Sequence, residues 1–233
     1  MSMMSATDKL FGTTTLDEQQ AALAKKTYAL LSVSVVTAAL GGYLGATSPL
    51  LLQFFRNPIG WILMIVLLNV VPHIALWASR QNPTVGILAL AADGFISGLA
   101  LSPLLWVASV LAPQAIPAAL GVTAAVFVAV TGYIMVTRDR FSAPGGLLTG
   151  IFFSLLAAIV LNAFLGFDWL SVAISIGIGI LGVLMLVYAT SDVLNNPDYN
   201  NPVQGALMLF AALFNIFASA LRLLIRLYAG GRD

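Results

Sequence analysis

The sequence predicts an all-α polytopic membrane protein, folded as a bundle of seven transmembrane helices. Composition is the first observation behind this prediction, because 60% of the 233 residues are hydrophobic and only 8% are charged. The mean hydropathy is +1.00. Soluble domains contain about a quarter charged residues, and disordered chains combine many charges with little hydrophobicity, so both classes are excluded. A net charge of +1 argues against nucleic acid as a partner and leaves the lipid bilayer as the expected one.

Seven apolar segments are the second observation. A hydrocarbon core about 30 Å thick takes about 20 helical residues to cross. Lipid offers no hydrogen-bond partner to an unpaired backbone group, so each segment must be a helix. The segments are residues 27–46, 58–78, 85–105, 117–136, 147–165, 170–188 and 203–227. The connections between them are short, which predicts a single transmembrane domain over residues 27–233.

The first 26 residues are polar, and we predict that they form a cytoplasmic N-terminal segment. Their charged residues are Asp8, Lys9, Asp17, Glu18, Lys25 and Lys26. This polar lead is too long for a cleaved signal peptide, so the first apolar segment is interpreted as a retained signal-anchor. Within the lead we predict a short helix over residues 16–24 that lies at the membrane surface.

Three apolar segments are preceded by the dipeptide Asn-Pro. Asparagine caps the free amides of a first helical turn, and proline fits the first helical position, where its missing N–H has no partner to lose. The three dipeptides are Asn57-Pro58, Asn82-Pro83 and Asn201-Pro202. We therefore predict helix starts at these points, and further starts near Pro117 and after Pro144.

Lysine and arginine near the segment ends predict the orientation, because cytoplasmic loops are enriched in both. Lys9, Lys25, Lys26, Arg80, Arg138 and Arg140 fall on the side of the N-terminus, and Arg56 falls on the other. This distribution predicts a cytoplasmic N-terminus and a multi-pass protein of the inner membrane. The last segment conflicts with the rule, since a full span would place Arg222, Arg226 and Arg232 outside. It either crosses against the bias or enters and returns.

Five stretches of the sequence, taken together with their order and spacing, resemble those of a known protein family. They are residues 26–32, residues 98–103, residues 133–138 with 141–142 and 145–148, residues 190–191, and residues 213–217 with Ser219. In this order and spacing the chain resembles the Bax inhibitor-1 (TMBIM) family, in its bacterial YccA-like branch. The resemblance covers the chain from about Lys25 onward. It implies a seven-helix fold in which the last helix lies at the centre.

The resemblance also implies two functions. Members of the family are associated with a pH-sensitive calcium leak through a pair of carboxylates, one in each of the last two helices. YccA-like members are linked instead to the restraint of a membrane-embedded, ATP-dependent quality-control protease. In this sequence the two acidic positions correspond to Ala189 and to a residue near Ala212. The carboxylate pair is therefore absent, and its mechanism does not transfer unaltered.

Asp93 is the most unusual residue of the apolar segments. It lies eight residues into its segment, or roughly 12 Å deep, where an acid costs about 2.5–3.5 kcal/mol to insert. One interpretation is a proton or cation site in an interior crevice. The other is a neutral carboxyl that is hydrogen-bonded to Ser97. The two are about equally supported.

Asn69 and His73 share one helical face, with Pro72 between them. Asn69 is expected at about the depth of Asp93, and an Asp93–His73 pair there would titrate near physiological pH. A neutral histidine bonded to a carbonyl that Pro72 leaves free is the favoured alternative. One histidine is too few for a metal site, and we expect neither a metal nor a cofactor.

Asp192 lies one helical turn beyond Ala189. It is a candidate replacement for the missing family acid, although a loop-edge aspartate that caps the residues after it is favoured. Together, Asp93, His73 and Asp192 suggest a gated crevice for protons or cations that opens to the inside.

The last segment carries a polar stripe of Asn215, Ser219, Arg222 and Arg226 on one face. A central helix needs such a face to form hydrogen bonds with its neighbours. Asn215 and Arg222 complete the candidate intramembrane polar site, which also contains Asp93, His73, Asn69 and Asp192. Arg222 is either the counter-ion of an acid or a side chain that snorkels to the surface.

Glycines recur in three segments, at Gly41 and Gly45, at Gly94 and Gly98, and from Gly177 to Gly182. We predict that they form smooth ridges for close helix packing. The sequence contains none of the common nucleotide-binding or hydrolase motifs, and we do not expect an enzyme. Two functions remain: a regulatory protein that binds other membrane proteins, including a protease complex, and a pH-dependent leak for Ca²⁺ or H⁺.

Overall fold

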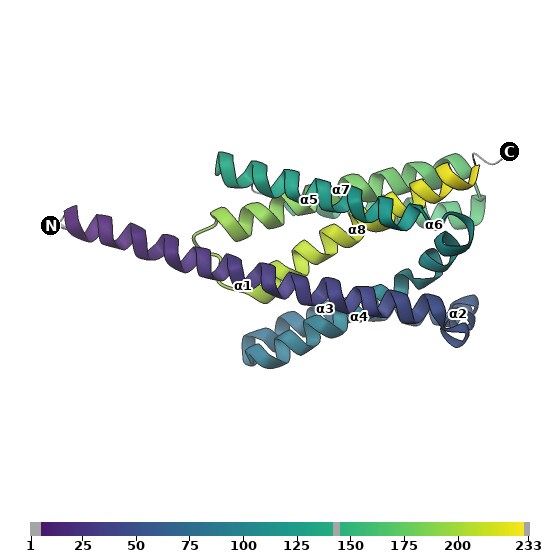
Figure 1. Cartoon of the computed structure of the whole chain (residues 1–233), viewed down its shortest axis with the longest axis horizontal. Coiled ribbons are helices and arrows are strands. Elements are labelled where there is room, and N and C mark those ends of the chain that lie inside the picture. The colour runs from purple at the N-terminus through teal and green to yellow at the C-terminus, as the bar shows by residue number, and fades with distance from the viewer. Residues whose placement is uncertain (1–5, 142–144, 231–233) are drawn as a thin grey trace.

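The computed structural model describes residues 6–141 and 145–230. Pro144 and Arg232 lie outside this range. Within it the chain forms eight α-helices and no strand. The helices are α1 (Ala6–Thr47), α2 (Pro49–Arg56), α3 (Pro58–Gln81), α4 (Pro83–Leu111), α5 (Ala115–Thr137), α6 (Gly145–Leu165), α7 (Asp168–Asn195) and α8 (Pro202–Gly230). The long helices run roughly along one common axis, and the short α2 lies at one end of the molecule (Figure 1).

The helices bear out a polytopic membrane protein. Six of them, α1, α3, α4, α5, α7 and α8, are long and apolar enough to cross a bilayer, and α6 contains the shorter apolar stretch Gly150–Asn162. Each of the seven predicted segments lies inside one helix. The eight-residue helix α2 was not predicted, because it is too short to register as a transmembrane segment.

The first helix is continuous from the polar lead into the membrane segment. The prediction of a separate surface helix over residues 16–24 is wrong, because α1 runs unbroken over 42 residues. Neither glycine nor proline occurs between Leu16 and Leu40, so no residue interrupts the helix. At 1.5 Å per residue α1 is about 63 Å long, roughly twice the hydrocarbon thickness. Its N-terminal part extends beyond the other helices (Figure 1).

The Asn-Pro helix starts are confirmed. The side-chain oxygen of Asn57 accepts a hydrogen bond from the amide of Ile59 at 3.0 Å. Asn82 does the same for Thr84 at 2.9 Å. The oxygen of Asn201 accepts from the amides of the two residues after Pro202, at 3.1 Å and 3.2 Å. These caps fix where α3, α4 and α8 begin.

The last helix crosses the whole bundle. α8 is one unbroken helix of 29 residues, and it runs antiparallel to α7, because Arg226 near its end contacts Asp168 at the start of α7. It packs against α1, α3, α4, α5 and α7. α8 therefore ends at the opposite end of the bundle from the lead (Figure 1). A segment that enters and returns is excluded.

Glycine residues set the contact between α1 and α4. A Cβ atom on Gly98 would overlap the carbonyl oxygen of Ala38, and a Cβ atom on Gly41 would overlap that of Phe95. Gly45 faces the side chain of Ser102. The two backbones thus approach more closely than larger side chains would allow, which confirms the predicted packing role of these glycines.

Candidate functional site

Polar contacts gather where the lead enters the bundle. We call this the N-terminal end; it comprises residues 18–28 of α1 together with the α5–α6 and α7–α8 connections. The hydroxyls of Thr27 and Tyr199 are hydrogen-bonded at 2.5 Å, although 172 residues separate them. Gln20 donates to the carbonyl of Asn196 at 3.0 Å. The first helix is therefore tied to the α7–α8 connection by two side chains.

The α5–α6 connection is tied to the end of α7. Ser191 donates to the carbonyl of Asp139 at 3.1 Å and accepts from the amide of Phe141 at 2.9 Å. Asn195 donates to the same Asp139 carbonyl at 3.0 Å. Arg138 ends α5 with a left-handed φ of 54°, which turns the chain toward these contacts. One serine and one asparagine thus hold this connection in place.

Three hydroxyls meet inside the N-terminal end without forming hydrogen bonds to protein atoms. Tyr28 of α1 faces Thr131 of α5 and Thr190 of α7. The geometry of a hydrogen bond is met by none of the three. Thr190 is completely buried. Because a buried hydroxyl without a partner is costly, this cluster is the least satisfied part of the described core.

Among the titratable groups that the structure describes in the connections between helices, Tyr199 has the most strongly shifted pKa. The pKa of Tyr199 is raised to about 12, mainly by burial and also by the charge of Asp192, while the hydrogen bond with Thr27 acts in the opposite direction. The phenol therefore stays protonated and can take part in the hydrogen bond at any physiological pH.

Asp192 belongs to this end of the bundle. Its carboxylate accepts a hydrogen bond from the side-chain amide of Asn196 at 2.6 Å, and it is half-buried. Sequence analysis favoured a loop-edge aspartate that caps the following residues; the structure places Asp192 in the last turn of α7, with the side chain of Asn196 as its partner. The contact holds the last turn of α7 onto the connection that follows.

Asp93 lies apart from the N-terminal end, inside α4. It is 4% exposed, and the neighbouring Gly94 packs directly on Ser34 and Thr37 of α1. Among the described residues no side chain forms a hydrogen bond or ion pair with Asp93. The predicted bond to Ser97 is absent.

Asn69 and His73 are exposed, whereas Asp93 is buried. Both are exposed on α3, and they line a shallow groove of about 340 Å³ together with Val70, Ile74 and Trp77. His73 bonds through Nδ1 to the carbonyl of Asn69 at 2.7 Å, which is not the carbonyl that Pro72 leaves free. The structure therefore does not bring His73 to the buried Asp93.

Three residues of the polar stripe of α8 contact α7. Asn215 contacts the sulfur of Met185 at 3.8 Å, and Ser219 donates to the carbonyl of Ser175 at 2.6 Å. Arg226 donates to the carbonyl of Asp168 at 3.2 Å. These contacts match the predicted bonds between α8 and a neighbour.

Arg222 lies on the exposed surface of α8. It is one turn from Arg226, whereas Asp192 is about 36 Å along α7 from Asp168. Arg222 and Asp192 are therefore at opposite ends of the bundle and do not pair.

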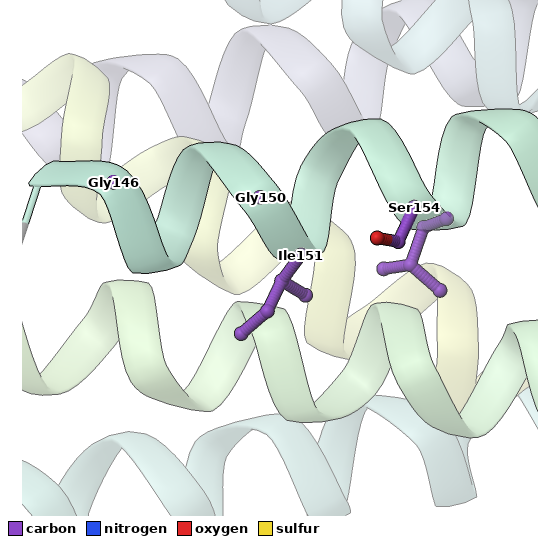
Figure 2. Close-up of a pocket in the computed structure, with 5 residues that line it drawn as sticks. Gly146, Gly150, Ile151 and Ser154 are labelled. Atoms are coloured by element: carbon purple, nitrogen blue, oxygen red, sulfur yellow. The ribbon is translucent and has the colours of Figure 1, made fainter.

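A second groove, of about 430 Å³, runs along α6 beside Gly146 and Gly150. In Figure 2, Ile151 points toward the neighbouring helix, which is α7, the helix against which α6 packs. Ser154 is the polar side chain of this groove. Across residues 6–141 and 145–230 no group of three or more His, Asp or Glu side chains is arranged to hold a metal ion.

The chain matches the family described as Inhibitor of apoptosis-promoting Bax1 over residues 20–228. It belongs to the Bax inhibitor-1 family. It is similar to the uncharacterized protein Cj0236c of Campylobacter jejuni, with 31% identity over 206 residues that cover 86% of each chain. It is also similar to the uncharacterized protein PA2604 of Pseudomonas aeruginosa, with 27% identity and 90% coverage of each chain.

A further relative carries a functional name. The Modulator of FtsH protease YccA of Escherichia coli is 32% identical over 149 residues, which cover 64% of this chain and 67% of YccA. The protein from a second strain of the same species is named Inner membrane protein YccA. This similarity supports the YccA-like branch of the Bax inhibitor-1 family.

The family resemblance implies two acidic residues, and alanines stand at the corresponding positions of this chain. Ala189 and Ala212 are both almost completely buried, and both belong to a hydrophobic cluster with Leu186, Leu209 and Ile216. A hydrophobic cluster therefore fills the space where a carboxylate pair would lie.

Sequence reasoning about intramembrane charge missed most of the N-terminal end. Thr27, Tyr28, Thr190 and Ser191 were singled out only by the family resemblance, and Tyr199 was not singled out at all. Their residue types were a weak signal, since hydroxyls inside transmembrane helices usually bond to their own backbone, as Thr27 also does to Leu23.

Proposed function

We propose that this Bax inhibitor-1 family protein is a multi-pass inner-membrane regulator that modulates a membrane-embedded, ATP-dependent quality-control protease or its partners. The observation that carries the proposal is the similarity to the Modulator of FtsH protease YccA. The Bax inhibitor-1 family is not a known family of enzymes, and we propose that this member has no catalytic activity. A regulator of this kind acts by binding, so the surface it presents matters more than a reactive group.

The structure supports a binding surface at the N-terminal end. Residues 6–26 of the lead belong to α1, and Gln20 ties them to the α7–α8 connection. Ser191 and Asn195 hold the α5–α6 connection beside that tie. A partner that binds the lead therefore contacts a surface to which three parts of the chain contribute.

The proposal includes the arrangement in the membrane. In this proposal the seven apolar helices form one bundle with α8 at its centre, and the contacts of α8 with α1, α3, α4, α5 and α7 support that position. The N-terminal end faces the cytoplasm, which agrees with its lysine and arginine residues. They are Lys25, Lys26, Arg80, Arg138 and Arg140 at this end, against Arg56, Arg222 and Arg226 at the other.

The direct test removes the lead. Replacing residues 1–20 by a start methionine is expected to reduce both recovery of the protease with this protein and the change in turnover of a membrane-bound protease substrate. The matched control is Gln20→Ala, which keeps the lead and removes only its contact with Asn196. Equal thermal unfolding midpoints would show that the shortened chain is folded. Unchanged recovery and unchanged turnover would refute the proposal.

A calcium or proton leak is the less supported function. Buried alanines stand at the two acidic positions of the family, and Asp93 has no described partner to relay a proton or hold a cation. The test is flux of calcium and protons in liposomes, from about pH 5 to about pH 8, with Asp93→Asn beside the wild type. Equal flux in both proteins is the expected result, and a leak that disappears in the variant would favour the conduit.

A further inference from the structure

The exposed face of α3 carries two polar side chains near the middle of the helix. Asn69 lies 11 residues into α3, or about 17 Å along it, and His73 lies one turn further. α3 packs against α2, α4 and α8 only, as far as the described residues extend. The side chains around the polar pair are exposed and apolar: Ile62, Ile65, Val66, Val70, Ile74 and Trp77.

The two side chains retain hydrogen-bonding capacity that their own helix does not use. Asn69 donates one amide hydrogen to the carbonyl of Ile65 at 2.7 Å, which leaves a second hydrogen and the side-chain oxygen free. A carbonyl can only accept, so the 2.7 Å contact of His73 with the Asn69 carbonyl places a proton on Nδ1. In the neutral ring Nε2 is then an acceptor.

Lipid chains offer no partner for these atoms, and polar side chains of this kind promote association of transmembrane helices. A free donor and free acceptors on one face also make that face self-complementary. The amide of Asn69 in one copy can donate to Nε2 of His73 in another, and a two-fold axis along the membrane normal repeats the bond. Such an axis keeps equivalent residues at equal depth.

We propose that the α3 face around Asn69 and His73 binds a second copy of this chain within the membrane, through two symmetric side-chain hydrogen bonds surrounded by apolar contacts. The contact goes beyond the proposed regulatory function and does not depend on it. Hydrogen-bond complementarity selects the occupant, because the same two residues supply the donor and the acceptor. An apolar helix from another protein would leave both unsatisfied.

Oxidative cross-linking in native membranes tests this contact, because the chain contains no cysteine. Val70→Cys introduces a thiol beside the polar pair and is expected to give a disulfide-linked dimer. Val128→Cys on α5 is the matched control, since this residue is 68% exposed on a different helix, and it is expected to remain monomeric. Equal cross-linking at both sites, or none at Val70→Cys, would overturn the proposal.

A second series tests the hydrogen bonds themselves. Asn69→Leu or His73→Leu, each combined with Val70→Cys, is expected to weaken dimerisation about fivefold to thirtyfold. Asn162→Leu on α6 removes a different intramembrane asparagine and should leave cross-linking unchanged. Size-exclusion chromatography in detergent checks that each variant is folded. Full cross-linking without Asn69 and His73, or a cross-link to a different protein, would contradict a second copy at this face.

Discussion

Two helix pairs in this protein are held together by different means. α1 and α4 pack backbone against backbone at Gly41 and Gly98, and the hydroxyls along them bond to their own helices, as Ser102 does to Leu99. α7 and α8 are instead joined by side chains, of which Ser219 and Arg226 bond to carbonyls of α7. We call these contacts the glycine seam and the polar seam.

The difference shows how a membrane protein can distribute rigidity. A glycine seam relies on close van der Waals contact over a long stretch, so a single methyl group in the wrong place separates two backbones. A polar seam relies on separate hydrogen bonds, so losing one leaves the others intact. The two seams should therefore differ in their tolerance of substitution.

The largest effect is expected at Gly98. In Gly98→Ala the new methyl group overlaps the Ala38 carbonyl and comes within 2.8 Å of the Gly42 amide nitrogen. The backbones must separate, which should cost about 2–3 kcal/mol of unfolding free energy. Unfolding in mixed micelles of increasing SDS content measures this loss.

Two glycines serve as controls for Gly98. Gly182 lies in the polar seam, where a Cβ atom would come 2.9 Å from Cγ1 of Ile216 and 3.0 Å from the Ala212 carbonyl oxygen and the Ile216 amide nitrogen. These contacts are less close than those at Gly98, so Gly182→Ala should cost less than Gly98→Ala. Gly121 has no atom within 4 Å of a Cβ position, so Gly121→Ala should be neutral or stabilise by up to about 1 kcal/mol. Equal losses at all three would remove the distinction between the seams.

A smaller effect is expected in the polar seam at Ser219. Ser219→Ala removes the 2.6 Å bond to the Ser175 carbonyl and should cost about 1 kcal/mol. The matched control is Ser154→Ala, at an exposed serine of α6, which should leave stability unchanged. The same SDS titration compares the two, and indistinguishable midpoints would show that this hydrogen bond contributes nothing.

A pH-dependent effect is expected where α1 meets the α7–α8 connection. Because the pKa of Tyr199 is raised from 10.0 to about 12 in the folded protein, the unfolded chain loses this proton first as the pH rises. The contribution of the protonated Tyr199 to the free energy of unfolding is complete below about pH 10 and is lost as the pH rises toward about 12. Tyr199→Phe should show a shallower decline in unfolding free energy across this interval. Parallel curves for the two proteins would argue against burial of the phenol.

The smallest effect is expected at Gln20. Gln20→Ala removes one partly exposed hydrogen bond to the Asn196 carbonyl and should cost at most about 0.5 kcal/mol of global stability. Hydrogen exchange in residues 196–201 should nevertheless become faster, because the lead no longer restrains that connection. Exchange at the wild-type rate would mean that the lead is not coupled to the connection.

Features that depend on neighbouring residues could be predicted from the sequence. The Asn57, Asn82 and Asn201 caps involve atoms two or three residues apart, and the glycine ridges follow from helical spacing. α2 could not be predicted from hydropathy, because eight residues are too few for a membrane segment. The continuity of α1 was not predicted, because the change from polar to apolar residues suggests a boundary. A helix continues across such a change as long as its residues favour the helical conformation.

Features that depend on packing between distant segments could not be predicted. The depth of a residue along its helix follows from its residue number, which predicts Asn69 at about the same depth as Asp93. The direction in which each side chain points depends on which helices are neighbours, and it separates the exposed His73 from the buried Asp93. The hydrogen bond between Thr27 and Tyr199 joins residues that are 172 positions apart, so no local pattern in the sequence predicts it.

The unbroken course of α1 has a mechanical consequence. No flexible tether separates the lead from the glycine seam, because both belong to one helix of 42 residues. A pulling force on the lead is therefore transmitted along the helix axis and acts as shear on the contact with α4. Removing the chain from the membrane in this way requires many close contacts to slide at once, so resistance to extraction is set by helix packing inside the bilayer.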